Sequence, residues 1–353
     1  MRRVARSRLY LRTPLLLLPL VTVLAACGAS GSAGSASSSL TAYSSGAWVE
    51  QHLQLSPTPR MKAVMATDPA TGTVVLFGGQ NDARNPTSSG LGDTWVWNGA
   101  TWTEAHPAVS PSPRWDATMA YDPKARTLVL FGGQSFRRIY GDTWTWDGTT
   151  WTEQHPLTSP SPRIRAAMAL DPRTGDDVLF GGIGADGHLR DTWSWNGQSW
   201  SELHPNTSPP EISAAAFAPD SAANQLVLFG GDTGHGLSQS GQTWLWNGSD
   251  WRHWTGTGPS PRDYAASASA SGGHGVILFG GLTIEGSLGP LGDTWQWSPA
   301  GWSKLSLSRS PPAREAAAMT EDEENGTVVL FGGENAYRGS LFGDTWTFRS
   351  SPG

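Results

Sequence analysis

The chain has 353 residues, including 43 glycines, 25 prolines, 19 tryptophans and one cysteine, and charged residues make up 15% of it. This composition suits many short strands joined by tight turns. The net charge is −6, and an acidic chain has no general attraction for nucleic acid or anionic lipid. A single cysteine excludes an intramolecular disulfide.

The N-terminus is typical of an export signal. Five arginines within residues 2–12 precede the apolar run 15–26, which is short for a membrane span but suits a signal-peptide core. The run ends in Leu24-Ala25-Ala26-Cys27, which resembles the lipobox of bacterial lipoproteins. The resemblance implies that Cys27 is lipidated and becomes the new N-terminus; an ordinary secretory signal with a chance cysteine is the alternative.

We therefore expect a signal peptide over residues 1–26 and a lipidated cysteine with a flexible Gly/Ala/Ser tether over 27–42. Removal of the signal peptide makes the mature chain more acidic still. The protein is expected to be exported and held by lipid at the outer face of the bacterial cytoplasmic membrane, or otherwise to reside in the periplasm or at the cell surface.

Internal repeats dominate the rest of the chain. Leu-Phe-Gly-Gly occurs six times, at a spacing near fifty residues, beginning at Leu76, Leu130, Leu179, Leu228, Leu278 and Leu330. Each copy is followed by Asp-Thr-Trp, or Gln-Thr-Trp in the fourth repeat. In five repeats a second tryptophan, a turn such as Asn98-Gly99 and a third tryptophan come next, whereas the sixth has Phe348 in place of the second tryptophan. Asn-Gly between apolar runs is a strong hairpin signal.

One repeat predicts four strands, A to D. In the second repeat, strand A runs from Arg114 to Tyr121, strand B ends at Gly132-Gly133, strand C covers 144–146 and strand D begins at Trp151. The Gly-Gly pairs, tryptophans and period together resemble the Kelch repeat family, which implies an all-β, six-bladed propeller of four-stranded blades over residues 43–353. Seventeen tryptophans occupy repeated positions and are expected to pack between blades.

The ends of the chain predict how the ring closes. The sixth repeat stops after Trp346 and Phe348 and lacks a strand D, whereas residues 43–48 match an isolated C-to-D turn and strand D. We expect the N-terminal strand to complete the last blade, which removes open sheet edges. A single ring of this kind is expected to be monomeric.

A repeated arginine and aspartate predict either an ion pair or a binding mouth on the rim where strands A begin. An extended arginine can reach the aspartate across the Gly-Gly pair, while free arginines would favour anionic groups. In the fourth repeat Glu211 is taken to replace the arginine, and Gln242 replaces the aspartate. The candidate rim consists of Arg60, Arg114, Arg163, Glu211, Arg262, Arg314 and Trp115, and the candidate partners are Asp93, Asp142, Asp191, Asp293 and Asp344.

Variable B–C loops on the same rim are a second place for recognition. They contain Arg84; Arg137, Arg138 and Tyr140; His188 and Arg190; His235; Glu285; and Tyr337 and Arg338. Trp115 and Trp254 lie outside the repeated tryptophan pattern and could stack on a ligand. Four histidines follow strand D but are too far apart to bind one metal ion, so neither a metal nor a cofactor is expected: His52, His106, His155 and His204.

Two functions follow from this rim. The first is a non-enzymatic surface module that binds a protein or an envelope saccharide through the B–C loops. The second is an enzyme acting on an anionic sugar in the central opening, with the arginines holding the substrate and Glu211 as acid or base. Resemblance to sialate mutarotases keeps the second function open without assigning any residue. Galactose-oxidase-type copper chemistry is disfavoured, because its tyrosine–cysteine cross-link would need the only cysteine, Cys27, which is the candidate for lipidation.

Overall fold

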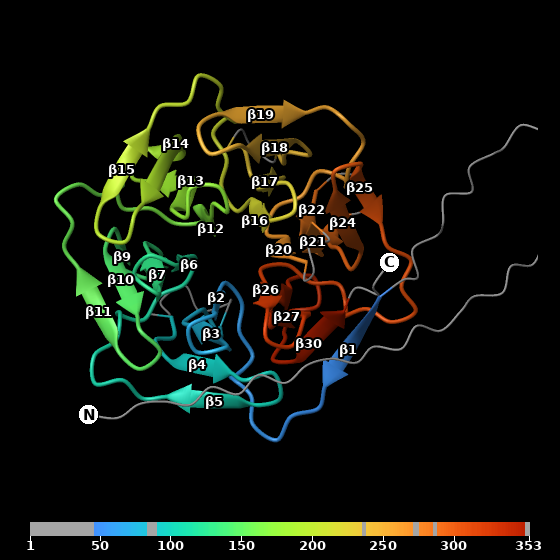
Figure 1. Cartoon of the computed structure of the whole chain (residues 1–353). Helices are drawn as coiled ribbons and strands as arrows, with labels where there is room; N and C mark the ends of the chain where they lie inside the picture. The colour runs from blue at the N-terminus through green and yellow to red at the C-terminus, as the bar shows by residue number, and fades with distance from the viewer. Residues whose placement is uncertain (1–45, 83–89, 235–237, 271–274, 285–287, 350–353) are drawn as a thin grey trace, which may run out of the picture. The chain divides into compact units, whose positions relative to one another are not determined.

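The computed structural model describes residues 46–82, 90–234, 238–270, 275–284 and 288–349; the predicted signal peptide, Cys27 and tether lie outside them. Tyr43–Gly353 forms one compact unit, separate from Met1–Ala42. In this unit six four-stranded antiparallel sheets surround a central axis (Figure 1). The predicted all-β, six-bladed propeller is confirmed. None of the described segments forms a helix able to cross a bilayer.

Blades 1 to 5 are built in chain order, from strand A at the axis to strand D outside. Blade 1 comprises β2 (Val64–Asp68), β3 (Thr73–Phe77), β4 (Thr94–Trp97) and β5 (Trp102–Ala105). Blade 2 comprises β6 (Thr118–Asp122), β7 (Thr127–Phe131), β10 (Thr143–Trp146) and β11 (Trp151–Gln154). Blade 3 comprises β12 (Ala167–Leu170), β13 (Asp177–Gly184), β14 (Gly187–Trp195) and β15 (Trp200–Leu203).

The next two blades repeat the arrangement. Blade 4 comprises β16 (Ala216–Asp220), β17 (Gln225–Phe229), β18 (Thr243–Trp246) and β19 (Trp251–Trp254). Blade 5 comprises β20 (Ala266–Ser269), β21 (Val276–Phe279), β24 (Thr294–Ser298) and β25 (Gly301–Lys304). Strands A and B are mostly buried because neighbouring blades pack on them, whereas most residues of strand D other than its tryptophan are exposed or half-buried.

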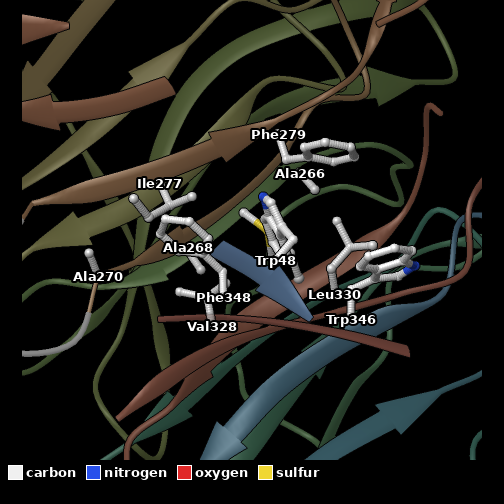
Figure 2. Close-up of a cluster of buried hydrophobic side chains, with 11 residues drawn as sticks. Trp48, Ala266, Ala268, Ala270, Ile277, Phe279, Val328, Leu330, Trp346 and Phe348 are labelled. Atoms are coloured by element: carbon white, nitrogen blue, oxygen red, sulfur yellow. The ribbon is translucent and has the colours of Figure 1, made fainter. Parts of the chain in front are cut away.

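Blade 6 joins the two ends of the chain, as predicted. It comprises β26 (Ala318–Asp322), β27 (Thr327–Phe331), β30 (Thr345–Arg349) and, as strand D, β1 (Ala47–Gln51). Trp48 of β1 pairs with Phe348 of β30 and is 1% exposed. Figure 2 shows its ring between Phe279 of blade 5 and Phe348 of blade 6, with centroids 5.5 and 5.1 Å away.

The third tryptophan of each repeat links neighbouring blades by a hydrogen bond. Trp151 Nε1 donates to Thr94 Oγ1 of blade 1 over 3.0 Å. The other five blades repeat the bond at 2.9–3.1 Å, through Trp48 and Thr294, Trp102 and Thr345, Trp200 and Thr143, Trp251 and Thr192, and Trp302 and Thr243. The threonine of Asp-Thr-Trp is therefore the acceptor that satisfies a buried indole N–H.

Three B–C connections form short hairpins on the face of the ring where strands A begin, which we call the B–C face. They are β8 (Gln134–Ser135) with β9 (Arg138–Ile139), β22 (Leu282–Thr283) with β23 (Gly289–Pro290), and β28 (Glu334–Asn335) with β29 (Ser340–Leu341). The A–B and C–D turns lie at the other ends of the same strands. The B–C face thus gathers the most variable segments of the repeats.

Replacing Trp48 with alanine is expected to reduce the free energy of unfolding by about 3–5 kcal/mol, because it opens a cavity at the closure and leaves Thr294 without its donor. Urea unfolding measures the loss. Val49→Ala on the same strand is the matched control, since Val49 is 50% exposed. Equal unfolding of the two variants would show that closure does not depend on this packing.

Candidate functional site

Each rim arginine is buried and paired with the aspartate of its own repeat. Arg163 donates to Asp191 through both terminal nitrogens, at 2.7 and 2.8 Å, and to the Gly181 carbonyl at 3.1 Å. The other four pairs have the same two-pronged geometry, and all five arginines are 1% exposed: Arg60 with Asp93, Arg114 with Asp142, Arg262 with Asp293 and Arg314 with Asp344. These guanidinium groups are not available to a ligand.

The aspartate is held from a third direction as well. Trp193 Nε1 donates to Asp191 over 2.7 Å, and the first tryptophan of every repeat makes the equivalent bond. Burial alone would raise the pKa of Asp191. The hydrogen bonds and positive charge of Arg163, together with the hydrogen bond from Trp193, outweigh burial, so the pKa is lowered. The arrangement fastens strand A to strand C and works as a structural clamp.

The fourth repeat corrects the alignment of Glu211. Ile212, not Glu211, occupies the position of the arginine: Gly182 donates its N–H to the Ile212 carbonyl as Gly133 does to that of Arg163. Ile212 is 2% exposed, whereas Glu211 is exposed. Gln242 keeps one bond of the missing aspartate by accepting from Trp244 Nε1 at 3.0 Å. Glu211 therefore cannot serve as the acid or base of a central site.

The two unpatterned tryptophans belong to the packing. Trp115 is 8% exposed, and a Cβ at Gly90 would lie 2.9 Å from its ring. Trp254 stands edge-on to Trp297 at 5.0 Å. Trp115 is therefore buried in the packing, and Trp254 is half-buried against it.

The variable-loop residues have different fates. Tyr140 is buried and covers Arg114, with 4.0 Å between the guanidinium carbon and the ring centroid. Arg84, His235 and Glu285 lie outside the described residues. The four histidines after strand D are exposed, and no three potential metal ligands cluster in the described ranges.

A ring of six residues encircles the axis on the B–C face, two positions after each arginine or Ile212. Each donates its N–H to the carbonyl of the equivalent residue in the preceding blade, at 2.9–3.2 Å, so the cycle closes. All six have φ between 50° and 57°, a strained region for residues other than glycine. Its members are Lys62, Asp116, Arg165, Ala214, Tyr264 and Ala316.

The side chains of this ring form a polar mouth around a cavity of about 180 Å³. Tyr264 reaches across the axis, and its hydroxyl makes a long 3.4 Å hydrogen bond to Asp116. Arg165 contacts the same carboxylate at 3.4 Å, and its guanidinium carbon lies 5.2 Å from the Tyr264 ring centroid. Burial, then the charge of Asp116, raises the pKa of Tyr264 well above its usual value, which keeps the hydroxyl protonated.

Below the mouth the channel is lined mainly by apolar side chains. Six alanines form one layer, followed after a further layer by four methionines with Phe217 and Ser267. The second glycine of each Gly-Gly pair lies against this layer and has no room for a side chain; a Cβ at Gly133 would lie 2.8 Å from that of Ala117. The alanine layer comprises Ala63, Ala117, Ala166, Ala215, Ala265 and Ala317.

Two carboxyl groups beside the mouth have raised pKa values. Burial, reinforced by Asp232, raises the pKa of Asp263 to about 6. Burial, then the charges of Glu334 and Asp263, raises the pKa of Glu315 to about 7, although Lys62 opposes the shift. Groups that titrate near neutrality and lie beside a cavity are candidates for proton transfer or ligand recognition.

Residues 27–218, more than half of the chain, match the model of the KLHDC2/KLHL20/DRC7 Kelch-repeats domain. The chain belongs to this Kelch family. Among solved structures, that of YjhT is 16% identical with a TM-score of 0.64, and the match covers 83% of this chain and 95% of that one. This likeness shows the fold alone. A search of curated proteins gives no match.

The Kelch propeller is a scaffold for protein interaction or for enzyme-like sites. The polar mouth was not predicted from the sequence. Its members differ in every repeat, so no motif marks them; the signal is their fixed register after the clamp arginine. The same register would have identified Ile212, because the arginine precedes the first glycine by 18 residues in every clamped repeat.

Removing only the arginine of one clamp is expected to lower the free energy of unfolding more than replacing both the arginine and the aspartate by the residues of the fourth repeat. Arg163→Ile alone should lower the free energy of unfolding by about 3 kcal/mol, because Asp191 is left without its partner. Adding Asp191→Gln should restore much of this loss, because Ile212 and Gln242 fill the same positions in blade 4. Urea unfolding at pH 7 compares the variants; equal losses would contradict the role of the pair.

Protonation of Glu315 gives a second prediction. Its pKa is raised in the folded state, so folding binds a proton between about pH 4.5 and 7, and stability falls as the pH rises through that window. The groups facing it are Glu334, Asp263 and Lys62. Relative to Glu315→Gln, the wild-type chain should lose on the order of 2–3 kcal/mol between pH 5 and 8. Parallel pH profiles in urea unfolding would contradict this prediction.

Proposed function

We propose that the protein is a binding module of the bacterial cell envelope that recognises a protein or a saccharide through its B–C face. The proposal rests on how the residues of that face are used. The repeated arginines and aspartates are paired with each other in the clamps. Large side chains are exposed on the hairpins instead, with exposed fractions of 47% for Phe136, 60% for Leu288 and 63% for Tyr337.

Exposure of large apolar side chains on short, well-anchored hairpins favours recognition. Each hairpin is held at its base by strands B and C, so its tip side chain is presented by a rigid framework. Aromatic residues on such loops are frequent anchors of protein and ligand contacts. Loops of different length and chemistry on one face give the ring a recognition surface that the repeats do not dictate.

Location and anchoring are part of the same proposal. The lipobox-like tetrapeptide ending at Cys27 supports export and lipid attachment, and the residues from 28 to 40 are almost all glycine, alanine and serine. Nineteen positions separate Cys27 from the start of β1 at Ala47. We propose that a single ring is tethered at the membrane surface with its B–C face free to bind.

The alternative is an enzyme that holds an anionic sugar with the rim arginines and uses Glu211 as acid or base. The residues named for this enzyme are not available for these roles. All five arginines are sequestered by aspartates, and Glu211 is not in their register. Burial of those arginines is the observation that separates the two hypotheses, and it favours the binding module.

The test compares the full chain in detergent with a variant of the B–C face that combines Phe136→Ala, Leu288→Ala and Tyr337→Ala. Thermal shift is measured with cellohexaose, maltohexaose, N-acetylchitohexaose, sialyllactose and polygalacturonate, and photo-cross-linking on intact cells samples protein partners. A ligand at 100 times its dissociation constant stabilises the fold by about 2.7 kcal/mol. Binding or cross-linking should vanish in the triple variant.

Gln198→Ala is the control, because Gln198 is exposed on a C–D turn at the opposite ends of the strands. It should bind as the wild type does. Binding that survives the triple variant, or the lack of both a sugar and a cross-linked protein, would overturn the proposal.

A further inference from the structure

A cavity of about 710 Å³ opens on the B–C face between blades 6 and 1. The hairpin β28–β29 forms one wall, and residues 61–62 and 80–82 of blade 1 form the other. Lys62 also lines the central mouth, so the two spaces adjoin. The volume lies within the range of roughly 300–1,000 Å³ typical of small-molecule sites.

Two glutamates lie directly opposite each other beside this cavity. Glu315 and Glu334 each donate the N–H to the other's carbonyl, at 2.9 Å, so they form a hydrogen-bonded antiparallel pair whose side chains share one face. No other blade places two acids at this bridge; its counterparts are Met61 with Gln80, Trp115 with Gln134, Ile164 with Ile183, Ser213 with Asp232, and Asp263 with Leu282. Like charges in this position destabilise a sheet, so the framework does not require the pair.

The polar groups of the pair are unused within the described part of the chain. Glu315 is 6% exposed, yet its carboxyl group makes no hydrogen bond or ion pair there. Glu334 is half-buried, lines the cavity and has no side-chain partner, and Lys62 makes no ion pair although it lies close enough to oppose the pKa shifts of both glutamates. Two groups able to bond a ligand, Glu334 and Lys62, therefore line the cavity without bonding each other.

Charge balance decides which ligand fits. Two basic side chains, Lys62 and Arg338, line the cleft together with two acidic ones, Asp82 and Glu334. The opposite charges of the lining therefore balance, and burial also raises the pKa of Glu334. A site with several donors and acceptors but little net charge favours a hydroxyl-rich neutral molecule over an ion.

Tyr337 adds an apolar face to the same cavity. It lies between the two strands of the hairpin β28–β29, is 63% exposed and lines the opening. Gly289 of blade 5 is its neighbour on one side, since a Cβ there would lie 3.6 Å from Tyr337 Cδ2. An open aromatic ring next to carboxyl and amine groups suits a sugar, whose C–H face packs on the ring while its hydroxyls bond the polar groups.

We propose that the cleft between blades 6 and 1 is a binding site for a neutral saccharide, with Tyr337 packing on a sugar ring and Glu334 and Lys62 bonding its hydroxyl groups. This inference rests on the proposed function and assigns its site and ligand class. It places recognition in one cleft of the B–C face, outside the central mouth.

Titration calorimetry on the full chain at pH 7 tests the assignment with cellohexaose, maltohexaose and N-acetylchitohexaose. At least one should bind the wild type, and Tyr337→Ala and Glu334→Gln should each weaken that affinity at least tenfold. Gln198→Ala is the control, because Gln198 is exposed on a C–D turn at the opposite ends of the strands, and it should leave the affinity unchanged. Glu334→Gln preserves the shape of the side chain, and thermal melting verifies that each variant is folded.

The outcomes separate this inference from the proposed function. Neutral-sugar binding that Tyr337→Ala and Glu334→Gln leave intact, but that the triple variant abolishes, would overturn the cleft and leave the proposed function standing. Binding only of sialyllactose or polygalacturonate, or cross-linking only to a protein, would overturn the ligand class alone. No sugar binding and no cross-linked protein would overturn both.

Discussion

Close approach of neighbouring blades around the axis is the constraint on which the molecule depends. The carbonyl of each arginine, or of Ile212, sits 2.4–2.6 Å from where a Cβ would stand on the first glycine of the preceding blade. The second glycine donates its N–H to the same carbonyl at 2.8–3.0 Å. Six such bonds form one ring, and the six strained mouth residues form another. Any side chain at the first glycines would force the blades apart, so the Leu-Phe-Gly-Gly repeat is a requirement of closure.

These two rings explain the division between constant and variable positions. The arginine clamp holds the segment whose carbonyl accepts the N–H of the second glycine, and the indole-to-threonine bonds join the outer strands of neighbouring blades. The motif residues therefore maintain the framework. Side chains that face the axis or the B–C face do not take part in these framework contacts. They differ from blade to blade, as Lys62, Asp116 and Tyr264 do, and can be chosen for a ligand without weakening the ring.

Sequence analysis identified the framework because each framework contact has a fixed spacing. The blade count, the four strands and the closure by Trp48 follow from in-register motifs and were confirmed. Glu211 was misassigned because one charged residue was matched to another, although the 18-residue spacing to the first glycine marks Ile212. The mouth and the Glu315–Glu334 pair could not be found in this way, since their neighbours are set by a bridge or by another blade and not by adjacent sequence.

The charges that escape the clamps are distributed unevenly around the axis. Asp116 of blade 2 is paired with Arg165, whereas Asp232, Asp263, Glu315 and Glu334 all lie on blades 4 to 6. The pKa values of Glu315 and Asp263 are raised by burial and by acidic neighbours. Lys62 and Arg165 come from blades 1 and 3, on either side of this acidic arc. Such a onefold charge pattern on a sixfold scaffold supports the proposal that recognition is concentrated at blade 6.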